Sequence, residues 1–327
     1  MTDISILLIA YNTRDLIQRC LTTVEDNKGE VSLEIIVADN HPGDGTKEML
    51  ASEFPQVKYY DTGGNLGFAR GVNFAATKAT SEYLLLLNPD TEVKPGTFEA
   101  LLELAHRRPD GGLYGGRTLN EHGDLDPGSC WGETTLWSLT CFATGLSAAF
   151  KDSMRFNPEE LPGWERDTER EVGYITGCLE LVSREVWDQL GGFDEDFWMY
   201  GEDADLARRA RELGYNPMIT PDAEIIHYVG ASSPNRAHKV ILRLTGDVTA
   251  VKKSWSGWKQ IYALACLKAG AAIRGLAYEV LALATKEKKT SGRYWFEVWS
   301  RRDEWVDGWK PAADRPVEAP HKVQSAA

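Results

Sequence analysis

The run Tyr83–Leu87, with the sequence YLLLL, constrains the fold most, because it is apolar on both faces and ends abruptly. Such a run suits a central strand of an α/β sheet that is covered on both sides. Asn88, Pro89 and Asp90 follow it, and proline stops the ladder because it has no N–H to donate. Open α/β sheets bind ligands at the carboxyl ends of their strands, where Asp90 and Glu92 would suit a divalent cation. The same residues also suit an ordinary Asx/Pro turn.

The part of the chain before this run alternates between strand and helix patterns. Helical spacing of apolar residues follows each apolar run, and Thr13 is the expected N-cap of the first helix. The alternation predicts a parallel sheet with right-handed crossovers. The predicted strands are Ile4–Ala10, Leu33–Ala38 and Val57–Tyr60, and the predicted helices are Arg14–Val24, Thr46–Phe54 and Phe68–Ala79.

Polar residues follow several of these strands directly. Tyr11 and Asn12 follow the first strand, and Asp39 and Asn40 follow the second. The carboxyl ends of parallel strands lie on one edge, so we expect these residues and the Asn88–Asp90 turn to converge. No GxGxxG follows the first strand and no GxxxxGK[ST] occurs, which weighs against a dinucleotide-binding Rossmann enzyme and a P-loop NTPase.

Charge and cysteine content narrow the class of protein. The chain carries 36 basic and 49 acidic residues, a formal net charge of -13, which argues against a general nucleic-acid binder. The five cysteines form no CxxC pair, so we expect neither a disulfide framework nor a Cys-rich zinc site. Free cysteines fit a protein of the reducing cytosol. We see no basic signal-peptide region and no apolar run of membrane-spanning length, and therefore expect a cytoplasmic protein.

The middle of the chain contains a segment that is hard to assign and a strand. Asn120–Asp167 is polar at first and then rich in aromatic and small residues, with many turn formers. A long loop of this kind is often a lid or a binding loop, and an irregular surface insertion is the alternative. Val172–Val182 predicts a strand in which Gly173 and Gly177 allow close backbone approach.

Three acidic residues, Glu202, Asp203 and Asp205, stand at the start of a predicted helix. Acidic residues in a first turn commonly offset the helix dipole, which is one interpretation. Aromatic faces beside carboxylates also hold sugars, whose C–H faces stack while their hydroxyls need acceptors. That pattern favours a functional role for Glu202 or Asp203. The aromatic residues just before them are Phe193, Phe197, Trp198 and Tyr200.

Two short strands, Met218–Ile219 and Glu224–His227, are predicted after that helix. The second ends at His227. A single histidine at a strand end is usually a hydrogen-bonded structural residue. At this edge it would also suit a metal ligand or a diphosphate contact.

The composition changes beyond Asn235. Helical patterns rich in Ala, Leu and Gly cover Val240–Ser254 and Trp258–Thr285, with basic residues and Trp among them. Basic residues with Trp suggest a membrane-surface helix. Charges that interrupt every apolar stretch favour instead a hairpin packed on the first domain or on a second subunit. Tyr294–Trp309 carries four Trp and should dock, whereas Pro311–Ala327 should be disordered.

The segments SILLIAYN, VADN, GNLGFARGVN, LLLLNPDTEV, TGCLELVSREVWDQLGGFDEDFWMYGEDADLARRARELGY and IIHYVGASS form an ordered set from Ile4 to Ser233. This set resembles inverting family-2 glycosyltransferases with the GT-A fold, and looks closest to the bacterial rhamnosyltransferase-like branch. The resemblance implies a catalytic domain over residues 1–235 with a Rossmann-like, mostly parallel central sheet flanked by helices. Residues 236–310 would form a C-terminal helical extension and residues 311–327 a disordered tail.

The resemblance also implies roles for single residues. Asp203, with Glu202 beside it, would be the general base. Asp90 and His227 would bind a divalent cation, Mn²⁺ or Mg²⁺, and Asn88 stands where the family has the first Asp of its Asp-x-Asp motif. The residues expected to contact the nucleotide or donor sugar are Ala10, Tyr11, Asn12, Asp39, Asn65, Arg70, Asn73, Asn88 and Asp90. The residues expected to contact the acceptor are Trp198, Gly177 and Trp131.

The implied reaction moves L-rhamnose from dTDP-L-rhamnose to a saccharide or lipid-linked saccharide in cell-envelope polysaccharide synthesis. Galactofuranose or a hexose as the donor sugar, and a small natural product as the acceptor, are alternatives within the family. A sugar-1-phosphate nucleotidyltransferase is disfavoured because the Gly-rich phosphate loop is missing. A non-catalytic binding scaffold is disfavoured by the presence of Asp90, Asp203 and His227. We expect no nucleic-acid partner, and peripheral contact with the inner face of the membrane or a homodimer through the C-terminal helices.

Overall fold

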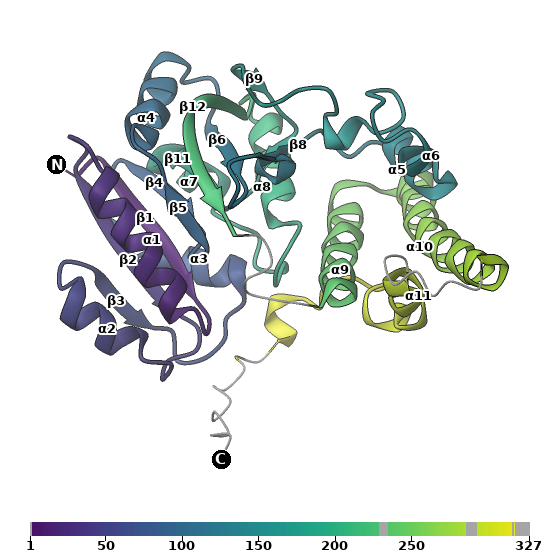
Figure 1. Cartoon of the computed structure of the whole chain (residues 1–327), viewed down its shortest axis with the longest axis horizontal. Coiled ribbons are helices and arrows are strands. Elements are labelled where there is room, and N and C mark those ends of the chain that lie inside the picture. Colours follow the sequence, from purple (N-terminus) through teal and green to yellow (C-terminus); the bar gives the residue numbers. More distant parts are fainter. Residues whose placement is uncertain (1, 229–234, 286–292, 316, 318–327) are drawn as a thin grey trace.

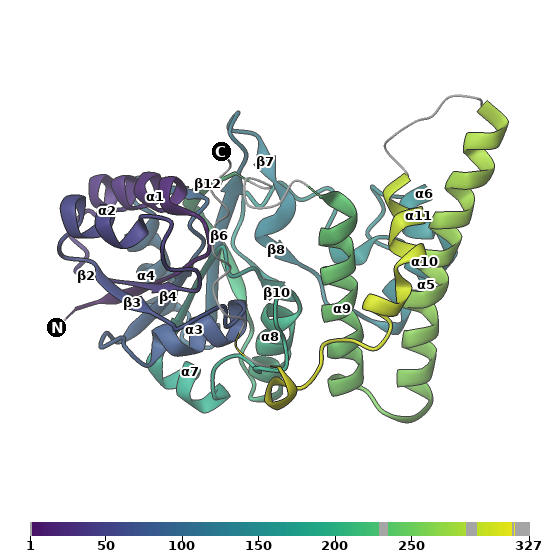
Figure 2. The same cartoon turned by 90° about the horizontal axis from the view of Figure 1, so that it is seen from below.

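The computed structural model describes residues 2–228, 235–285, 293–315 and 317 (Figure 1). A central sheet lies between two layers of helices, and a further group of helices stands at one side (Figures 1 and 2). The predicted α/β architecture with a C-terminal helical extension is therefore confirmed. None of the described helices is both long and apolar enough to cross a membrane.

The central sheet contains ten of the twelve described strands. The strands are β1 Ile4–Ala10, β2 Leu33–Asp39, β3 Lys58–Asp61, β4 Tyr83–Leu87, β5 Thr91–Val93, β6 Leu113–Leu119, β7 Leu125–Asp126, β8 Cys130–Trp131, β9 Arg170–Glu171, β10 Tyr174–Ile175, β11 Leu179–Ser183 and β12 Met218–His227. Their order is β3-β2-β1-β4-β11-β6-β12-β5, with β7 beside β6 and β9 beside β12. Strands β3, β2, β1 and β4 are parallel, and so are β6 and β12, whereas β11 and β5 run antiparallel to their neighbours. A small second sheet pairs β8 with β10.

Helices cover both faces of this sheet. The α-helices of the described residues, including those that stand beside the sheet, are α1 Arg14–Asn27, α2 Thr46–Glu53, α3 Phe68–Ala76, α4 Thr97–Arg107, α5 Leu136–Thr144, α6 Leu146–Ala149, α7 Arg184–Leu190, α8 Glu202–Glu212, α9 Arg236–Ser254, α10 Gly257–Thr285 and α11 Arg293–Ser300. Helices α1, α2 and α4 pack on one face, and α3, α7 and α8 pack on the other. Along β1, Ile6 and Leu8 join the first cluster while Leu7 and Ile9 join the second. Burial on both faces explains why the central strands are apolar throughout.

The strands predicted in the first part of the chain are present, and Ile4–Ala10 and Tyr83–Leu87 have the predicted bounds. Thr13 is the N-cap residue of α1, as predicted, and its carbonyl accepts from the Ile17 amide at 2.9 Å. Its side chain makes no capping hydrogen bond to α1, and its hydroxyl instead accepts from the Tyr11 amide at 3.3 Å. Thr13 therefore shapes the turn that leaves β1.

Two strand predictions in the second part need correction. Val172–Val182 is not one strand but splits into β10 and β11, which lie in different sheets. The break falls at Gly177, whose amide donates to Oδ2 of Asp203 at 3.2 Å rather than to a neighbouring strand. Met218–Ile219 and Glu224–His227 belong to one strand, β12, with an irregular register between them.

The C-terminal helices share their core with an earlier part of the chain. Helices α5, α9, α10 and α11 surround a third hydrophobic cluster. Helix α5 belongs to the segment Asn120–Asp167, so the predicted lid or loop contributes a helix to this layer (Figure 2). Trp305 is fully buried there and donates to the Val298 carbonyl at 3.0 Å, which confirms the predicted docking of Tyr294–Trp309.

The predicted disordered tail is wrong for residues 311–315. Ala312–Asp314 form a short 3-10 helix, and the Ala312 amide donates to Oδ1 of Asp196 at 2.7 Å. The guanidinium of Arg315 lies 5.5 Å from the ring centroid of Trp198. These contacts stabilise the segment against the first domain. The remainder of the predicted tail, residues 318–327, lies outside the described residues.

One buried carboxylate ties the amino ends of three strands together. Glu34 on β2 accepts from the hydroxyl of Ser5 on β1, and from the amide and hydroxyl of Thr80 at 2.8 and 3.0 Å. It also pairs with Lys58 on β3. Burial alone would raise the pKa of Glu34, but the hydrogen bonds from Lys58, Ser5 and Thr80 hold it at about 2. A carboxylate whose pKa falls on folding stabilises the folded state above its unfolded pKa.

We predict that Glu34→Gln lowers the free energy of unfolding by about 3 kcal/mol at pH 7, because each pKa unit is worth about 1.4 kcal/mol. The wild-type advantage should shrink as the pH falls from the unfolded pKa near 4.5 toward 2, to about half at pH 3. Urea unfolding at pH 7 and pH 3 measures both values. Glu30→Gln, at an exposed site, is the control and should change the free energy by less than about 0.5 kcal/mol. An equal loss for Glu34→Gln at both pH values would contradict this account.

Candidate active site at the carboxyl ends of the strands

The predicted polar clusters meet at one edge of the sheet. Ala10 and Asp39 are register partners at the ends of β1 and β2, and the Asn40 amide donates to the Ala10 carbonyl at 2.9 Å. Strand β4 runs parallel beside β1, so the Asn88–Asp90 turn leaves the sheet on the same side. The convergence expected from the parallel topology is thus present.

Tyr11, Asn12 and Asp39 surround the end of β1. The exposed ring of Tyr11 meets His41 edge-on, with ring centroids 5.3 Å apart, and Asn12 turns the chain with a φ of 54°. Asp39 is buried, and its carboxylate accepts from the His41 amide and the Tyr59 hydroxyl, each at 2.9 Å. Burial raises the pKa of Asp39. Each of its oxygens has a second lone pair that can accept an N–H from a nucleobase.

The end of β12 brings His227 to Asp90. His227 is the register partner of Thr91 on β5, and its Nε2 lies 3.4 Å from Oδ1 of Asp90. Its Nδ1 lies 3.5 Å from Oδ2 of Asp126 at the end of β7. Burial alone would lower the pKa of His227, but Asp126 and Asp90 raise it to about 9. Asp126 was not predicted, because its only signal in the sequence is its place before the Pro127-Gly128 turn.

This arrangement fits a divalent cation that is shared with a diphosphate. Oδ2 of Asp126 and Nδ1 of His227 are buried, and within the described ranges they have only each other, at 3.5 Å, as polar partners. Those ranges hold no group of three His, Cys, Asp or Glu side chains able to bind a metal ion by themselves. Mg²⁺ and Mn²⁺ commonly use one or two carboxylates together with substrate phosphates. Glu92 pairs with Arg19 and lies outside this set.

Helix α8 supplies the candidate base in its first turn. Gly201 precedes the helix with a φ of 97°, which favours glycine. Oδ2 of Asp203 accepts from the Gly177 amide at 3.2 Å, whereas Oδ1 is buried without a hydrogen-bond partner among the described residues. Glu202 beside it is 3% exposed. Asp203 therefore has one oxygen held and the other available to accept a proton.

A third carboxylate interacts with this pair. Glu180 on β11 is fully buried, and neither of its oxygens has a hydrogen-bond partner in the described part of the chain. Burial and the charge of Asp203 raise the pKa of Glu180 well above its usual value. Burial also raises the pKa of Asp203 to about 7 and, with the charge of Asp203, that of Glu202 to about 8. A raised pKa lets a carboxylate accept a proton near neutral pH. Glu180 was not predicted, although a carboxylate within the apolar run CLELV is a signal.

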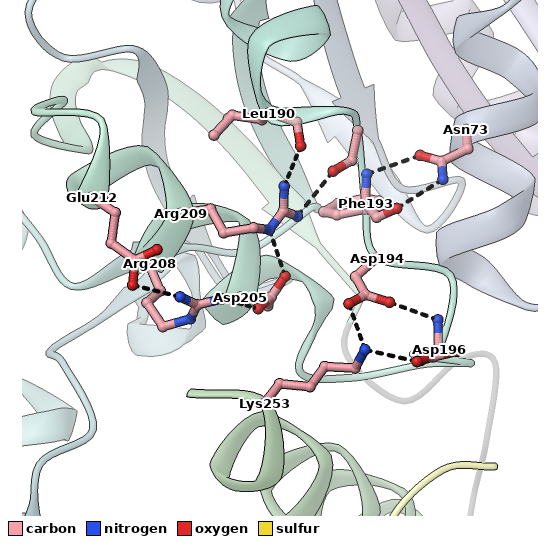
Figure 3. Close-up of polar contacts among 11 residues, drawn as sticks. Asn73, Leu190, Phe193, Asp194, Asp196, Asp205, Arg208, Arg209, Glu212 and Lys253 are labelled. Carbon is pink, nitrogen blue, oxygen red and sulfur yellow. Dashed lines mark hydrogen bonds and ion pairs between the residues drawn. The ribbon is translucent and has the colours of Figure 1, made fainter. Parts of the chain in front are cut away.

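The third acid of this turn, Asp205, has a structural role (Figure 3). It accepts from Arg208 and from Arg209, each at 2.7 Å. Arg209 also donates to the carbonyls of Leu190 and Gly192 at 2.6 and 2.9 Å. Asp205 therefore fixes α8 to the segment that precedes it.

Asn73 supports the same segment (Figure 3). Its Nδ2 donates to the Phe193 carbonyl and its Oδ1 accepts from the Phe193 amide, each at 2.9 Å. Its Nδ2 also donates to Glu195 at 3.3 Å. These bonds occupy both ends of the side-chain amide. The structure thus gives Asn73, expected to contact the nucleotide or donor sugar, a structural role at Phe193.

The Gly-rich loop before α3 lies against Trp198. Oδ1 of Asn65 accepts from the Gly67 amide at 2.9 Å. Gly67 has a φ of 79°, and a Cβ there would fall 2.7 Å from the Trp198 ring, so only glycine fits. Nη1 of Arg70 is buried and has no hydrogen-bond partner among the described residues. An unpaired guanidinium N–H suits a phosphate or sugar oxygen.

The three predicted acceptor residues lie in two places. Gly177 contacts Asp203, and Trp131 lies on β8, whose partner strand β10 contacts α8. Trp198 packs on the Gly67 loop, and its carbonyl accepts from the Phe68 amide at 2.8 Å. The structure therefore brings Gly177 and Trp131 to the α8 side, and Trp198 to the loop whose Phe68 ring borders Gly177.

Comparison with known sequences agrees with this geometry. The family "Glycosyl transferase family 2" matches residues 5–156, and "N-terminal domain of galactosyltransferase" matches residues 166–231. An N-acetylglucosaminyl-diphospho-decaprenol L-rhamnosyltransferase of Mycobacterium tuberculosis is 28% identical over 248 residues, which are 71% of this chain and 78% of the relative. The low-salt glycan biosynthesis hexosyltransferase Agl10 of Haloferax volcanii is 25% identical over 220 residues, 66% of this chain and 64% of that protein.

Two solved structures share the fold. GalNAc-T7 with UDP, GalNAc and Mn²⁺ superposes with a TM-score of 0.59 at 15% identity, over 82% of this chain and only 51% of that one. A mannosyltransferase from Pyrobaculum calidifontis with GDP-Man and Mn²⁺ superposes with a TM-score of 0.56 at 18% identity, over 95% of this chain and 85% of that one. The chain is therefore similar in sequence to the family-2 glycosyltransferases and has the GT-A fold.

Proposed function

We propose that this glycosyltransferase moves L-rhamnose from dTDP-L-rhamnose to a hydroxyl of a lipid-linked saccharide, with inversion, in cell-envelope polysaccharide synthesis. The observation that carries the proposal is Asp203, with one oxygen held by the Gly177 amide and the other without a hydrogen-bond partner in the described residues. The mycobacterial relative, named as an L-rhamnosyltransferase acting on a diphospho-decaprenol-linked sugar, supports the donor and acceptor. The relative named as a hexosyltransferase makes a hexose the alternative donor sugar.

In the proposed reaction, Asp203 accepts the proton of the acceptor hydroxyl while that oxygen attacks the anomeric carbon. The bond to the nucleoside diphosphate breaks, and its electron pair leaves with the diphosphate. The Gly177 hydrogen bond orients the carboxylate, and its raised pKa, about 7, makes it basic near neutral pH. One attack from the opposite face inverts the anomeric centre without a protein nucleophile.

The donor is held at the strand edge. Tyr11 and Asp39 would contact the base, and Arg70 would donate to a phosphate or sugar oxygen. Asp90 and His227 would hold a Mn²⁺ or Mg²⁺ ion. When bound, this ion neutralises charge on the departing diphosphate.

A lipid-linked acceptor requires approach to a membrane surface. Helix α10 exposes large apolar side chains, with Trp258, Ile261 and Leu276 67%, 71% and 62% exposed. Apolar side chains on a helix that also carries lysines suit the headgroup boundary of a bilayer. The same face could instead form a homodimer.

Incubation with radiolabelled nucleotide sugars, Mn²⁺ and an N-acetylglucosaminyl-diphosphoprenol acceptor tests the function. We expect a labelled lipid product from dTDP-L-rhamnose. A product from UDP-galactofuranose or a UDP-hexose alone would replace the donor sugar and keep the mechanism. If the protein neither transfers nor hydrolyses any nucleotide sugar, that result would favour a non-catalytic binding protein.

We predict that Asp203→Asn lowers kcat by about 10²- to 10⁴-fold, because the amide cannot accept the proton. Donor binding by calorimetry should be unchanged. In the wild type, kcat/KM should fall about tenfold per pH unit below pH 7, because only the ionised Asp203 acts as a base. Glu212→Gln, at the exposed end of the same helix, is the control and should keep full activity. Full activity of Asp203→Asn would exclude it as the base.

We predict that Asp90→Asn weakens binding of a nucleoside diphosphate in Mn²⁺ but not in excess chelator, because the side chain acts through the cation. Calorimetry under both conditions measures the difference. Glu92→Gln is the matched control, since Glu92 pairs with Arg19, and it should keep the effect of Mn²⁺. If chelator leaves wild-type binding unchanged, Asp90 is not a metal ligand.

We predict that the protein floats with vesicles containing anionic lipid, and that the double substitution Trp258→Ser and Ile261→Ser reduces the bound fraction severalfold, because it removes exposed apolar area. A Leu213→Ser variant, exposed on the first domain, is the control and should float like the wild type. Flotation that does not change with the double substitution would argue against this helix as the membrane contact.

A further inference from the structure

An arginine of the C-terminal extension lies at the acceptor side of the site. The guanidinium of Arg243 on α9 stacks on Trp131, with its centre 4.8 Å from the ring centroid, and its side chain is exposed. Trp131 pairs with Tyr174 across the small sheet of β8 and β10. Stacking on an indole fixes the plane of the guanidinium and leaves its N–H groups at the edge free to bind other partners.

Helix α9 lies very close to the start of α8 (Figures 1 and 2). A Cβ at Gly246 would fall 2.1 Å from the carbonyl oxygen of Tyr200, and a Cβ at Gly201 would fall 3.1 Å from the Gly246 backbone. Only glycines allow these backbones to approach so closely. Arg243 is three residues before Gly246, on the same face of the helix. It therefore lies about one turn from the backbone that leads into Asp203.

The ion pairs of Lys253 hold α9 in this position (Figure 3). Its Nζ lies 2.7 Å from the carboxylates of Asp194 and of Asp196, in the segment before α8. The C-terminal extension is thus joined to the catalytic segment by both packing and charge. Arg243 keeps a defined place beside the candidate base.

Two carboxylates accompany Arg243. Asp247 follows it by one helical turn on α9. Glu159 lies beside Trp131, because its carbonyl accepts from the Gly132 amide at 2.8 Å and its carboxylate accepts from Thr134 at 3.3 Å. Burial raises the pKa of both carboxylates, that of Glu159 to about 7. These groups offer hydrogen-bond donors and acceptors together.

Two carboxylate oxygens of Glu202 and Asp203 receive no hydrogen bond from the part of the chain that the structure describes. Oδ1 of Asp203 and Oε2 of Glu202 are buried and have no hydrogen-bond partner in the described ranges. Buried carboxylate oxygens without partners are costly, and a hydroxyl-bearing ligand would satisfy them. The ligand would extend from these oxygens toward Arg243.

The charges around Arg243 indicate a neutral ligand. A phosphate placed here would meet the carboxylates of Asp247 and Glu159 as well as the guanidinium, and the repulsion would offset the attraction. Adjacent hydroxyls of a sugar ring suit this set of one guanidinium and two carboxylates, since a hydroxyl can donate to a carboxylate and accept from a guanidinium.

We propose that Arg243, Asp247 and Glu159 form a subsite for a neutral sugar ring of the acceptor, with Trp131 holding Arg243 in place. This inference rests on the proposed transferase function. It assigns the first helix of the C-terminal extension to acceptor recognition. Trp131 acts through Arg243 rather than as a platform for the sugar itself.

The test compares two acceptors that carry the same sugar: octyl N-acetylglucosaminide, which has no phosphate, and N-acetylglucosaminyl-diphosphoprenol. Arg243→Ala should raise the KM for both acceptors by about tenfold or more, because charged hydrogen bonds are lost. Hydrolysis of the donor in the absence of acceptor should keep its wild-type rate. Arg236→Ala is the matched control, since Arg236 lies on the same helix but stacks on Tyr294, 4.3 Å from its centroid.

Several results would overturn the subsite. One is a change in KM for the diphosphate-bearing acceptor alone. Another is an equal rise in KM for Arg236→Ala. A third is that octyl N-acetylglucosaminide neither acts as an acceptor nor competes with the lipid acceptor. Loss of donor hydrolysis in Arg243→Ala would show a general structural defect and would also overturn it. A wild-type protein that hydrolyses no nucleotide sugar would contradict the proposed function itself. Trp131→Ala should give a smaller rise in both KM values, not additive with Arg243→Ala.

Discussion

The hydrogen bond between the Gly177 amide and Asp203 links the central sheet to helix α8. The next residue, Cys178, accepts from the Asn88 amide at 3.3 Å through its carbonyl. Two consecutive residues therefore hold both the candidate base and the turn that carries Asp90. A Cβ at position 177 would lie 3.1 Å from the Phe68 ring and 3.3 Å from Oδ1 of Asp203, so a side chain there would crowd both. The relative positions of base and donor site follow from this short backbone segment.

The acidic cluster at this point has opposing effects on stability and chemistry. Glu180, Glu202 and Asp203 share a site with few hydrogen-bond donors, and burial raises the pKa of each. Keeping carboxyl groups there costs stability at neutral pH, since the unfolded chain ionises them freely. The surrounding network offsets part of this cost through Asp205 and its two arginines, and through Lys253. A raised pKa is also what makes a carboxylate an effective base near pH 7.

Sequence patterns were sufficient for features set by local periodicity and by parallel topology. Tyr83–Leu87 was predictable because burial on both faces leaves a continuous apolar run, and the convergence of Asp39 with Asp90 followed from strand direction. Asp126, Glu180 and Arg243 were not predicted, because their importance arises from pairing between segments distant in the chain. Val172–Val182 was predicted as one strand, because the hydrogen bond from the Gly177 amide to Asp203 on a distant helix leaves no signal in the local sequence. The segment around α5 was assigned to a loop because its apolar face is completed only by α10.

Proton NMR of the transfer product tests the central claim, a single displacement assisted by Asp203, most directly. The measurement compares the anomeric configuration of the transferred sugar with its configuration in the nucleotide donor. The account predicts the opposite configuration, because the acceptor attacks from the face opposite the diphosphate. A retained configuration would require a second displacement, through a covalent intermediate on a protein nucleophile, and would contradict the account.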